Sequence, residues 1–146
     1  MAIDFKVLPE YQTWYMLHEV DAGIMRSVEN ELRPFGISPI AAGVLYIVKY
    51  SSEPVTLSEL SRWLFRERHT ISELIGRMAK QGLVKKMRSR HGKGMVSLEL
   101  TKKGSEVLDQ YWKEMKVVRN IVSCLSKEET DNLMACLDKL KGKIVE

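Results

Sequence analysis

The chain has 146 residues, the length of one ordinary domain, of which 45% are hydrophobic and 29% are charged. This composition supports a packed core and excludes an intrinsically disordered tail. No segment approaches the roughly 18 consecutive apolar residues of a membrane-spanning helix, and the first residues lack the basic and apolar regions of a signal peptide. We therefore expect a cytoplasmic protein with no membrane partner.

Positive charge is concentrated in the middle of the chain. The formal net charge is +4, yet between Thr56 and Gly104 twelve Lys and Arg residues stand against only four Asp and Glu residues. A basic segment within an acidic frame is typical of a surface that binds a polyanion. Charge alone would equally fit a solvated face, so the interpretation depends on the motif that carries it.

The residues that usually carry catalysis or bind metals are scattered. The two cysteines, Cys124 and Cys136, form no CxxC pair, and His18, His69 and His91 lie far apart. The sequence contains no HExxH motif, phosphate-binding loop or GxGxxG motif. We therefore expect no metal, no cofactor and no enzymatic activity.

Two helices open the chain. Apolar residues between about Pro9 and Arg33 cover more than a narrow stripe, which predicts a long helix that packs on more than one side. Pro34, Phe35 and Gly36 end this helix. Ser38 is suited to cap a second helix that begins at Pro39 and continues to Tyr50.

A helix-turn-helix follows. Thr56 and Glu59 have the spacing of a capping box at the start of a short helix. After a turn around residues 65–68, Ile71, Leu74, Ile75 and Met78 recur at the spacing of a single buried helical face. Gly82 is placed to end that second helix in a left-handed conformation.

The apolar period then changes from helical to alternating. Residues 83–88 and 95–100 alternate as strands do, and the basic segment 89–94 between them predicts a hairpin. A hairpin directly after a helix-turn-helix is the wing of a winged helix. Thr101 can cap a following helix that runs to about Val122, and Ser126 with Glu129 forms a second capping box. The last helix is expected to turn Leu133, Leu137 and Leu140 inward.

These elements predict one mainly α-helical domain over residues 1–146 with a small β-hairpin. Its winged helix-turn-helix lobe spans residues 36–100. Residues 8–34 and 101–146 supply dimerisation helices, because their apolar surface exceeds what a lone winged helix covers.

Two stretches resemble the MarR family of transcriptional regulators. The first runs from Thr70 to Val84, and the second runs from Val96 through Leu100-Thr101-Lys102-Lys103-Gly104. The resemblance implies a homodimer that binds a pseudopalindromic duplex DNA operator, with release by a small-molecule effector or by thiol oxidation. The chain departs from the family at the wing tip, where Gly92-Lys93-Gly94 replaces Asp-x-Arg, and at Glu73, where many members have Arg.

The candidate DNA contacts share a position away from the predicted core. A major groove needs hydrogen-bond donors and acceptors there, and cations on a hairpin tip suit phosphates or the minor groove. An ordinary solvated surface is the alternative. The candidates are Arg66, Arg68, His69, Thr70, Ser72, Glu73, Arg77 and Lys80 in the helix region, with Arg88, Arg90 and Lys93 in the hairpin.

Candidate effector contacts are aromatic residues together with one histidine. Core packing is the favoured alternative for most of them, and His18 is better explained as a hydrogen-bonded structural residue than as a metal ligand. The two cysteines are candidates for a redox switch, although small buried hydrophobic residues are the commoner role. The effector candidates are Trp14, His18, Tyr46, Tyr111 and Trp112.

A sequence-specific DNA-binding regulator, most simply a repressor, is the leading hypothesis. A winged-helix module that binds protein without specific DNA binding is the main alternative, because of Glu73 and the altered wing tip. A thiol-based redox-sensing regulator is the other alternative. No nucleophile–base pair, metal set or cofactor loop supports an enzyme.

Overall fold

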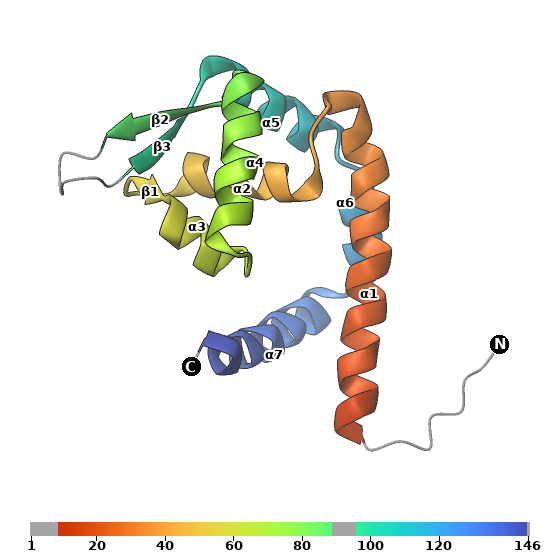
Figure 1. Ribbon diagram of the computed structural model, residues 1–146. Helices are drawn as coiled ribbons and strands as arrows, with labels where there is room; N and C mark the ends of the chain where they lie inside the picture. The colour runs from red at the N-terminus through yellow and green to blue at the C-terminus, as the bar shows by residue number, and fades with distance from the viewer. Residues whose placement is uncertain (1–8, 89–95, 146) are drawn as a thin grey trace. The chain divides into compact units, whose positions relative to one another are not determined.

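A computed structural model describes residues 9–88 and 96–145 and divides the chain into two compact units, Met1–Glu114 and Met115–Glu146. The fold is mainly helical with a small antiparallel sheet, which confirms the predicted fold class (Figure 1). The first unit contains, in order, α1 (Pro9–Leu32), the 3-10 helix η1 (Arg33–Phe35), α2 (Pro39–Tyr50), β1 (Val55–Thr56), α3 (Leu57–Trp63), α4 (Arg68–Lys80), β2 (Val84–Arg88), β3 (Val96–Leu100) and α5 (Lys102–Glu114); the second contains α6 (Val117–Val122) and α7 (Lys127–Val145).

Local hydrogen bonds set the starts of α2 and α3. The Ser38 hydroxyl accepts a bond from the Ala41 amide at 3.2 Å, with Pro39 in the first turn of α2. At α3, the Thr56 amide donates to the Glu59 carboxylate at 2.7 Å, and the Glu59 amide donates to the Thr56 hydroxyl at 3.3 Å. Both predicted caps are therefore confirmed.

The sheet has three strands in the order β1-β3-β2, all antiparallel. Strands β2 and β3 form the predicted hairpin, with Val84 opposite Leu100 and Arg88 opposite Val96. Strand β1 was not predicted, because its two residues are too few to show alternation. The predicted hairpin tip, including Arg90 and Lys93, lies outside the described residues.

The core of the first unit lies where the helices meet the sheet. Helices α3 and α4 pack together, and α2 packs against both α5 and β3. The large side chains that are almost completely buried come from five helices and β1: Leu32, Val44, Leu45, Val55, Leu60, Ile71, Ile75, Met78 and Leu108.

A close contact joins α5 to the end of α4. A Cβ atom added to Gly104 would lie 2.0 Å from the carbonyl oxygen of Leu83, so only glycine fits there. The Thr101 hydroxyl accepts a bond from the Gly104 amide at 3.0 Å and donates to the Gly82 carbonyl oxygen. Gly82 itself has a φ of +74°. The Leu-Thr-x-x-Gly motif therefore seats the start of α5 against the α4–β2 turn.

The helices after Thr101 contradict one prediction and confirm another. The helix expected to run from Thr101 to Val122 is interrupted, because α5 ends at Glu114 and α6 begins at Val117 with no proline or glycine at the break. The predicted cap at Ser126 is present, with the Glu129 amide donating to the Ser126 hydroxyl at 3.2 Å.

The leucines of α7 are not turned into a core. Leu133, Leu137 and Leu140 are exposed, so the prediction that they face inward is wrong for the single chain. The physical reason is size, because a unit of two helices has too little surface to cover a full helical stripe. An exposed apolar stripe therefore runs along α7.

No single described helix has the length and apolar character needed to cross a membrane. The segments Pro9–Phe35 and Pro39–Tyr50 meet that test only together, across a bend of 77°. Part of the apolar content of α2 is explained by burial, since Ala41, Val44 and Leu45 belong to the core.

The contact at Gly104 generates a stability prediction. Gly104→Ala should lower the free energy of unfolding by at least about 3 kcal/mol, the upper end of typical overpacking costs, because backbone must move to admit the methyl group. Gly23→Ala is the matched control, since no described neighbouring atom lies within 4 Å of its added Cβ. That control should raise the free energy of unfolding by about 0.5–1 kcal/mol, because alanine is favoured over glycine in the middle of a helix. Urea denaturation measures both changes, and equal stabilities of the two variants would refute the close contact.

Candidate nucleic-acid interface

Helix α4 has one buried and one polar face. Ile71, Leu74, Ile75 and Met78 are buried, at the positions that the apolar spacing predicted. Among the predicted contact residues, Thr70 and Ser72 are half-buried, whereas the charged side chains and His69 are exposed. The exposed members on α4 are Arg68, His69, Glu73, Arg77 and Lys80.

The turn before α4 is held by hydrogen bonds to α3. The Arg66 amide donates to the Ser61 carbonyl oxygen at 3.1 Å, and the Ser61 hydroxyl donates to the Arg66 carbonyl oxygen. Glu67 precedes the first helical residue, and its side chain makes no capping bond. The first-turn amides of α4 and the adjacent Arg66 therefore offer hydrogen-bond donors at the same end of the helix.

The wing strand β2 also carries exposed cations. Lys85, Lys86 and Arg88 are all exposed. Successive side chains of a strand point to opposite faces, so Lys86 and Arg88 share one face while Lys85 takes the other. Arg88 was a predicted DNA contact and the two lysines were not, although their position on the predicted strand was already visible in the sequence.

The cations of α4 and β2 are not neutralised within the described part of the chain. Ion pairs form elsewhere in that part of the chain, among them Lys49–Asp109, Lys102–Glu106 and Lys127–Asp131, and none of these involves α4 or β2. Glu73 is the acidic residue on the polar face of α4. The positive charge of this surface therefore remains available to a partner that carries negative charge.

The predicted effector residues fall into two sets of ring contacts, both in the first unit. On α1, Trp14 stacks on His18 with ring centroids 5.9 Å apart and planes 9° apart. Trp14 is 56% exposed and His18 is also exposed, so core packing is the wrong interpretation for both in the single chain. A hydrogen-bonded structural role for His18 stays a prediction.

The second set joins α2 to α5. Tyr46 meets Trp112 edge-on with centroids 5.9 Å apart, and Trp112 lies 5.8 Å from Tyr111. Tyr111 is 5% exposed, which confirms core packing for this residue, while Tyr46 is 48% exposed. Effector binding at either set stays a prediction.

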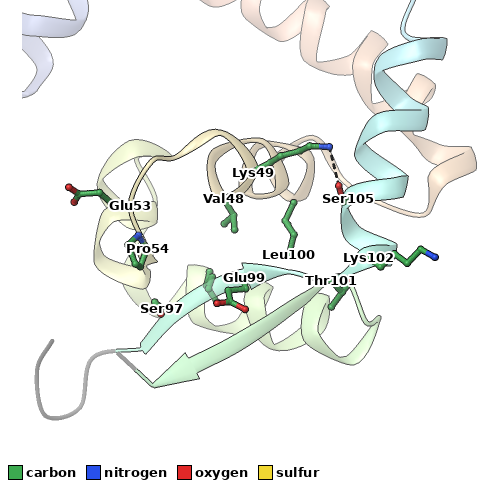
Figure 2. Close-up of a pocket in the computed structure, with 11 residues that line it drawn as sticks. Val48, Lys49, Glu53, Pro54, Ser97, Glu99, Leu100, Thr101, Lys102 and Ser105 are labelled. Atoms are coloured by element: carbon green, nitrogen blue, oxygen red, sulfur yellow. Dashed lines mark hydrogen bonds between the residues drawn. The ribbon is translucent and has the colours of Figure 1, made fainter. Parts of the chain in front are cut away.

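A cavity of about 590 Å³ lies elsewhere in the first unit, beside α2, β3 and the start of α5 (Figure 2). Val48 and Leu100 give it an apolar part. Lys49 Nζ donates to the Ser105 hydroxyl at 3.0 Å and pairs with Asp109, tying α2 to α5. None of the predicted aromatic residues lines this cavity, and no motif in the sequence marks it.

Both cysteines are exposed, with free thiols. Cys124 lies between α6 and α7, and Cys136 lies on α7. Their interpretation as small buried hydrophobic residues is therefore wrong for the single chain, because the helices of the second unit leave these positions open to solvent. A redox role stays a prediction.

The sequence of residues 37–104 matches a family model described as a winged helix DNA-binding domain. The matched segment runs from just before α2 to the Gly104 contact, and so contains both the polar face of α4 and the exposed cations of β2. No curated protein sequence matches the chain.

Solved structures of MarR-type regulators superpose on nearly the whole chain. The organohalide-sensing regulator RdhR-CbdbA1625, bound to 2,4-dichlorophenol, matches with a TM-score of 0.82 and 23% identity over 99% of this chain and 90% of that one. AbsC, a MarR family regulator from Streptomyces coelicolor, gives 0.82 and 20% over 97% and 98%. A mutant of MarR from E. coli complexed with operator DNA gives 0.77 and 20% over 86% and 91%.

The buried ring of Tyr111 generates a pH prediction. Burial raises the pKa of Tyr111 above its ordinary value of 10.0, and the negative charge of Glu31 raises the pKa further. A raised pKa means that the folded state favours the protonated phenol. The contribution of the protonated Tyr111 phenol to the free energy of unfolding is therefore fully present below pH 10. It is lost as the pH rises through the folded-state pKa.

In the Tyr111→Phe variant the free energy of unfolding should therefore fall less steeply above pH 10 than in wild type. Denaturant titrations at a series of alkaline pH values measure this fall. Tyr50→Phe, at a 59% exposed ring, is the control and should keep the wild-type slope. Identical alkaline slopes for wild type and Tyr111→Phe would show that the Tyr111 pKa is not raised.

Proposed function

We propose that this chain, which has the winged helix-turn-helix fold of MarR-family regulators, is a sequence-specific DNA-binding transcriptional regulator. The proposal further makes it a homodimeric repressor of a pseudopalindromic operator. The observation that supports it best is the polar face of α4, whose cations are exposed beside the basic strand β2 and take part in none of the described ion pairs. The match of this same segment to a winged helix DNA-binding family adds support.

Helix α4 is the element proposed to enter the major groove. Its 13 residues span about 20 Å at 1.5 Å per residue, and a major groove about 12 Å wide admits one helix. Residues near the start of a recognition helix reach furthest toward the base edges, which places Arg68, His69 and Ser72 there. An arginine in this position suits the two acceptors of guanine, and Glu73 suits the amino group of cytosine.

The remaining cations are proposed to contact phosphates. Arg77 and Lys80 lie in the last turn of α4, and Lys85, Lys86 and Arg88 lie on β2. Such contacts fix the position of the protein on the duplex and make affinity depend on salt, without reading sequence. The predicted contacts Arg90 and Lys93 belong to the same proposal.

A second copy of the chain is the proposed cover for two exposed apolar surfaces. Helix α1 exposes Trp14, Leu17 and Val20, among others, and α7 exposes its leucine stripe. Surfaces of this kind are typical of subunit interfaces. A two-fold axis would place two α4 helices in successive major grooves about 34 Å apart, which is why a pseudopalindromic operator is expected.

Release by a small aromatic effector is the last part of the proposal. RdhR-CbdbA1625 is an organohalide-sensing regulator with a bound dichlorophenol. In this chain Tyr46 and Trp112 offer an edge-on ring pair between α2 and α5, with Tyr46 half-exposed. A flat ring could pack there, and it would shift DNA affinity only if it bound the two states of the protein unequally.

Charge removal tests the DNA assignment. Arg68→Ala should weaken specific binding by about 1–3 kcal/mol and relax the preference at one base pair, as measured by titration of a selected duplex. Lys86→Ala should weaken binding to all duplexes alike and lower the salt slope by about one. Lys113→Ala, an exposed cation on α5, is the control that should change neither quantity. Unchanged affinity in both test variants would remove α4 and β2 from the interface.

A further inference from the structure

Phe65 combines two unfavourable features in the turn between α3 and α4. Its backbone has a φ of +50°, the one positive φ outside glycine among the described residues. Bulky side chains rarely adopt this region, because Cβ crowds the following carbonyl group. The ring is also 53% exposed, so a large apolar surface remains in water. Neither the backbone nor the core gains from an aromatic side chain at this position.

The surrounding hydrogen bonds keep Phe65 in that conformation. The Leu64 amide donates to the Leu60 carbonyl oxygen at 2.9 Å, which ends α3 directly before Phe65. On the other side, Arg66 is bonded through both its amide and its carbonyl oxygen to Ser61. The turn is therefore fixed on both sides of Phe65, and the ring is presented outward by a backbone held in place. Strain that a structure maintains in this way is concentrated at functional sites.

The position of Phe65 makes it continuous with the proposed DNA surface. It precedes Arg68, the first residue of α4, by three positions, and it adjoins Arg66, a predicted DNA contact. The start of a recognition helix is the part that reaches deepest into the major groove. In that groove the base edges are polar except for one group, the 5-methyl group of thymine.

We propose that the ring of Phe65 packs against the 5-methyl group of a thymine and so selects thymine at one position in each half of the operator. This inference rests on the proposed DNA-binding function. The contact removes apolar surface of both partners from water, which is favourable in proportion to the area covered. Phe65 thereby supplies an apolar selection element beside the hydrogen-bonding side chains of α4.

The test replaces thymine by deoxyuridine, which deletes the methyl group and leaves every hydrogen-bonding atom in place. A duplex that binds the full-length protein is first selected from a random-sequence pool. Each thymine of that duplex is then replaced in turn by deoxyuridine, and dissociation constants are measured for wild type, Phe65→Ala and the control Tyr50→Ala. Tyr50 is a similarly exposed ring at the end of α2, outside the proposed surface. Thermal melting of all three proteins verifies that they are folded.

The expected result is position-specific. At one thymine per half-site, deoxyuridine should weaken wild-type binding about fourfold, the effect of losing one buried methyl group. Phe65→Ala should bind the thymine duplex more weakly and lose this discrimination, whereas Tyr50→Ala should retain it. A Phe65→Leu variant keeps an apolar side chain and should retain part of it.

Two results would overturn the inference in distinguishable ways. If wild type selects a duplex specifically but is indifferent to deoxyuridine at every position, or if Phe65→Ala keeps the wild-type discrimination, the ring does not read a thymine methyl group and the DNA-binding function stands. If wild type selects no duplex from the pool, the proposed function fails and the Phe65 inference fails with it.

Discussion

The burial of one face of α4 is the constraint on which the rest of the proposed interface depends. Four apolar side chains at i, i+3, i+4 and i+7 pack into the core of the first unit and leave little freedom for rotation of the helix. Rotating the helix would expose Ile71 and Ile75 and bury Arg68 or Arg77. Each isoleucine exposed together with an arginine buried would lower the free energy of unfolding by several kcal/mol. The orientation of the polar face is therefore a consequence of core packing.

The turn chemistry on either side of α4 then fixes where the helix begins and ends. Ser61 holds the turn before it, and Gly82 in a left-handed conformation ends it. The Thr101 hydroxyl joins the end of α4 to the start of α5, and Gly104 allows the helix to approach the Leu83 backbone. The same short stretch thus positions α4, the β2–β3 hairpin and α5, the helix that leads to the second unit.

Much of the first unit could be predicted from sequence because its signals are local. A capping hydrogen bond joins residues three positions apart, and the buried stripe of α4 repeats within seven positions, so Ser38, Thr56 and the α4 stripe are visible in the sequence alone. The wing was visible for the same reason, as a change in apolar period. Strand β1 was not, because a two-residue strand is defined by its partner Leu98 and not by its own pattern.

The signals that failed depend on distant or intermolecular contacts. The break between α5 and α6 carries no proline or glycine that would mark it in the sequence. The leucines of α7 have the regular spacing of a buried helical stripe, yet the single chain leaves them exposed. Residues of ordinary type, such as Val48 and Ser105, line the cavity only because α2, β3 and α5 meet there. The strain at Phe65 likewise becomes visible only once backbone angles are known.

The central claim is that α4 and the wing strand β2 form the DNA-binding surface. Amide hydrogen exchange, measured on the full chain with and without a selected duplex, tests this claim most directly. The account predicts that added duplex slows exchange at the start of α4 and along β2, with two chains bound per duplex, and leaves the C-terminal half of α7 unchanged. Slowed exchange along α7, with α4 and β2 unaffected, would contradict the account.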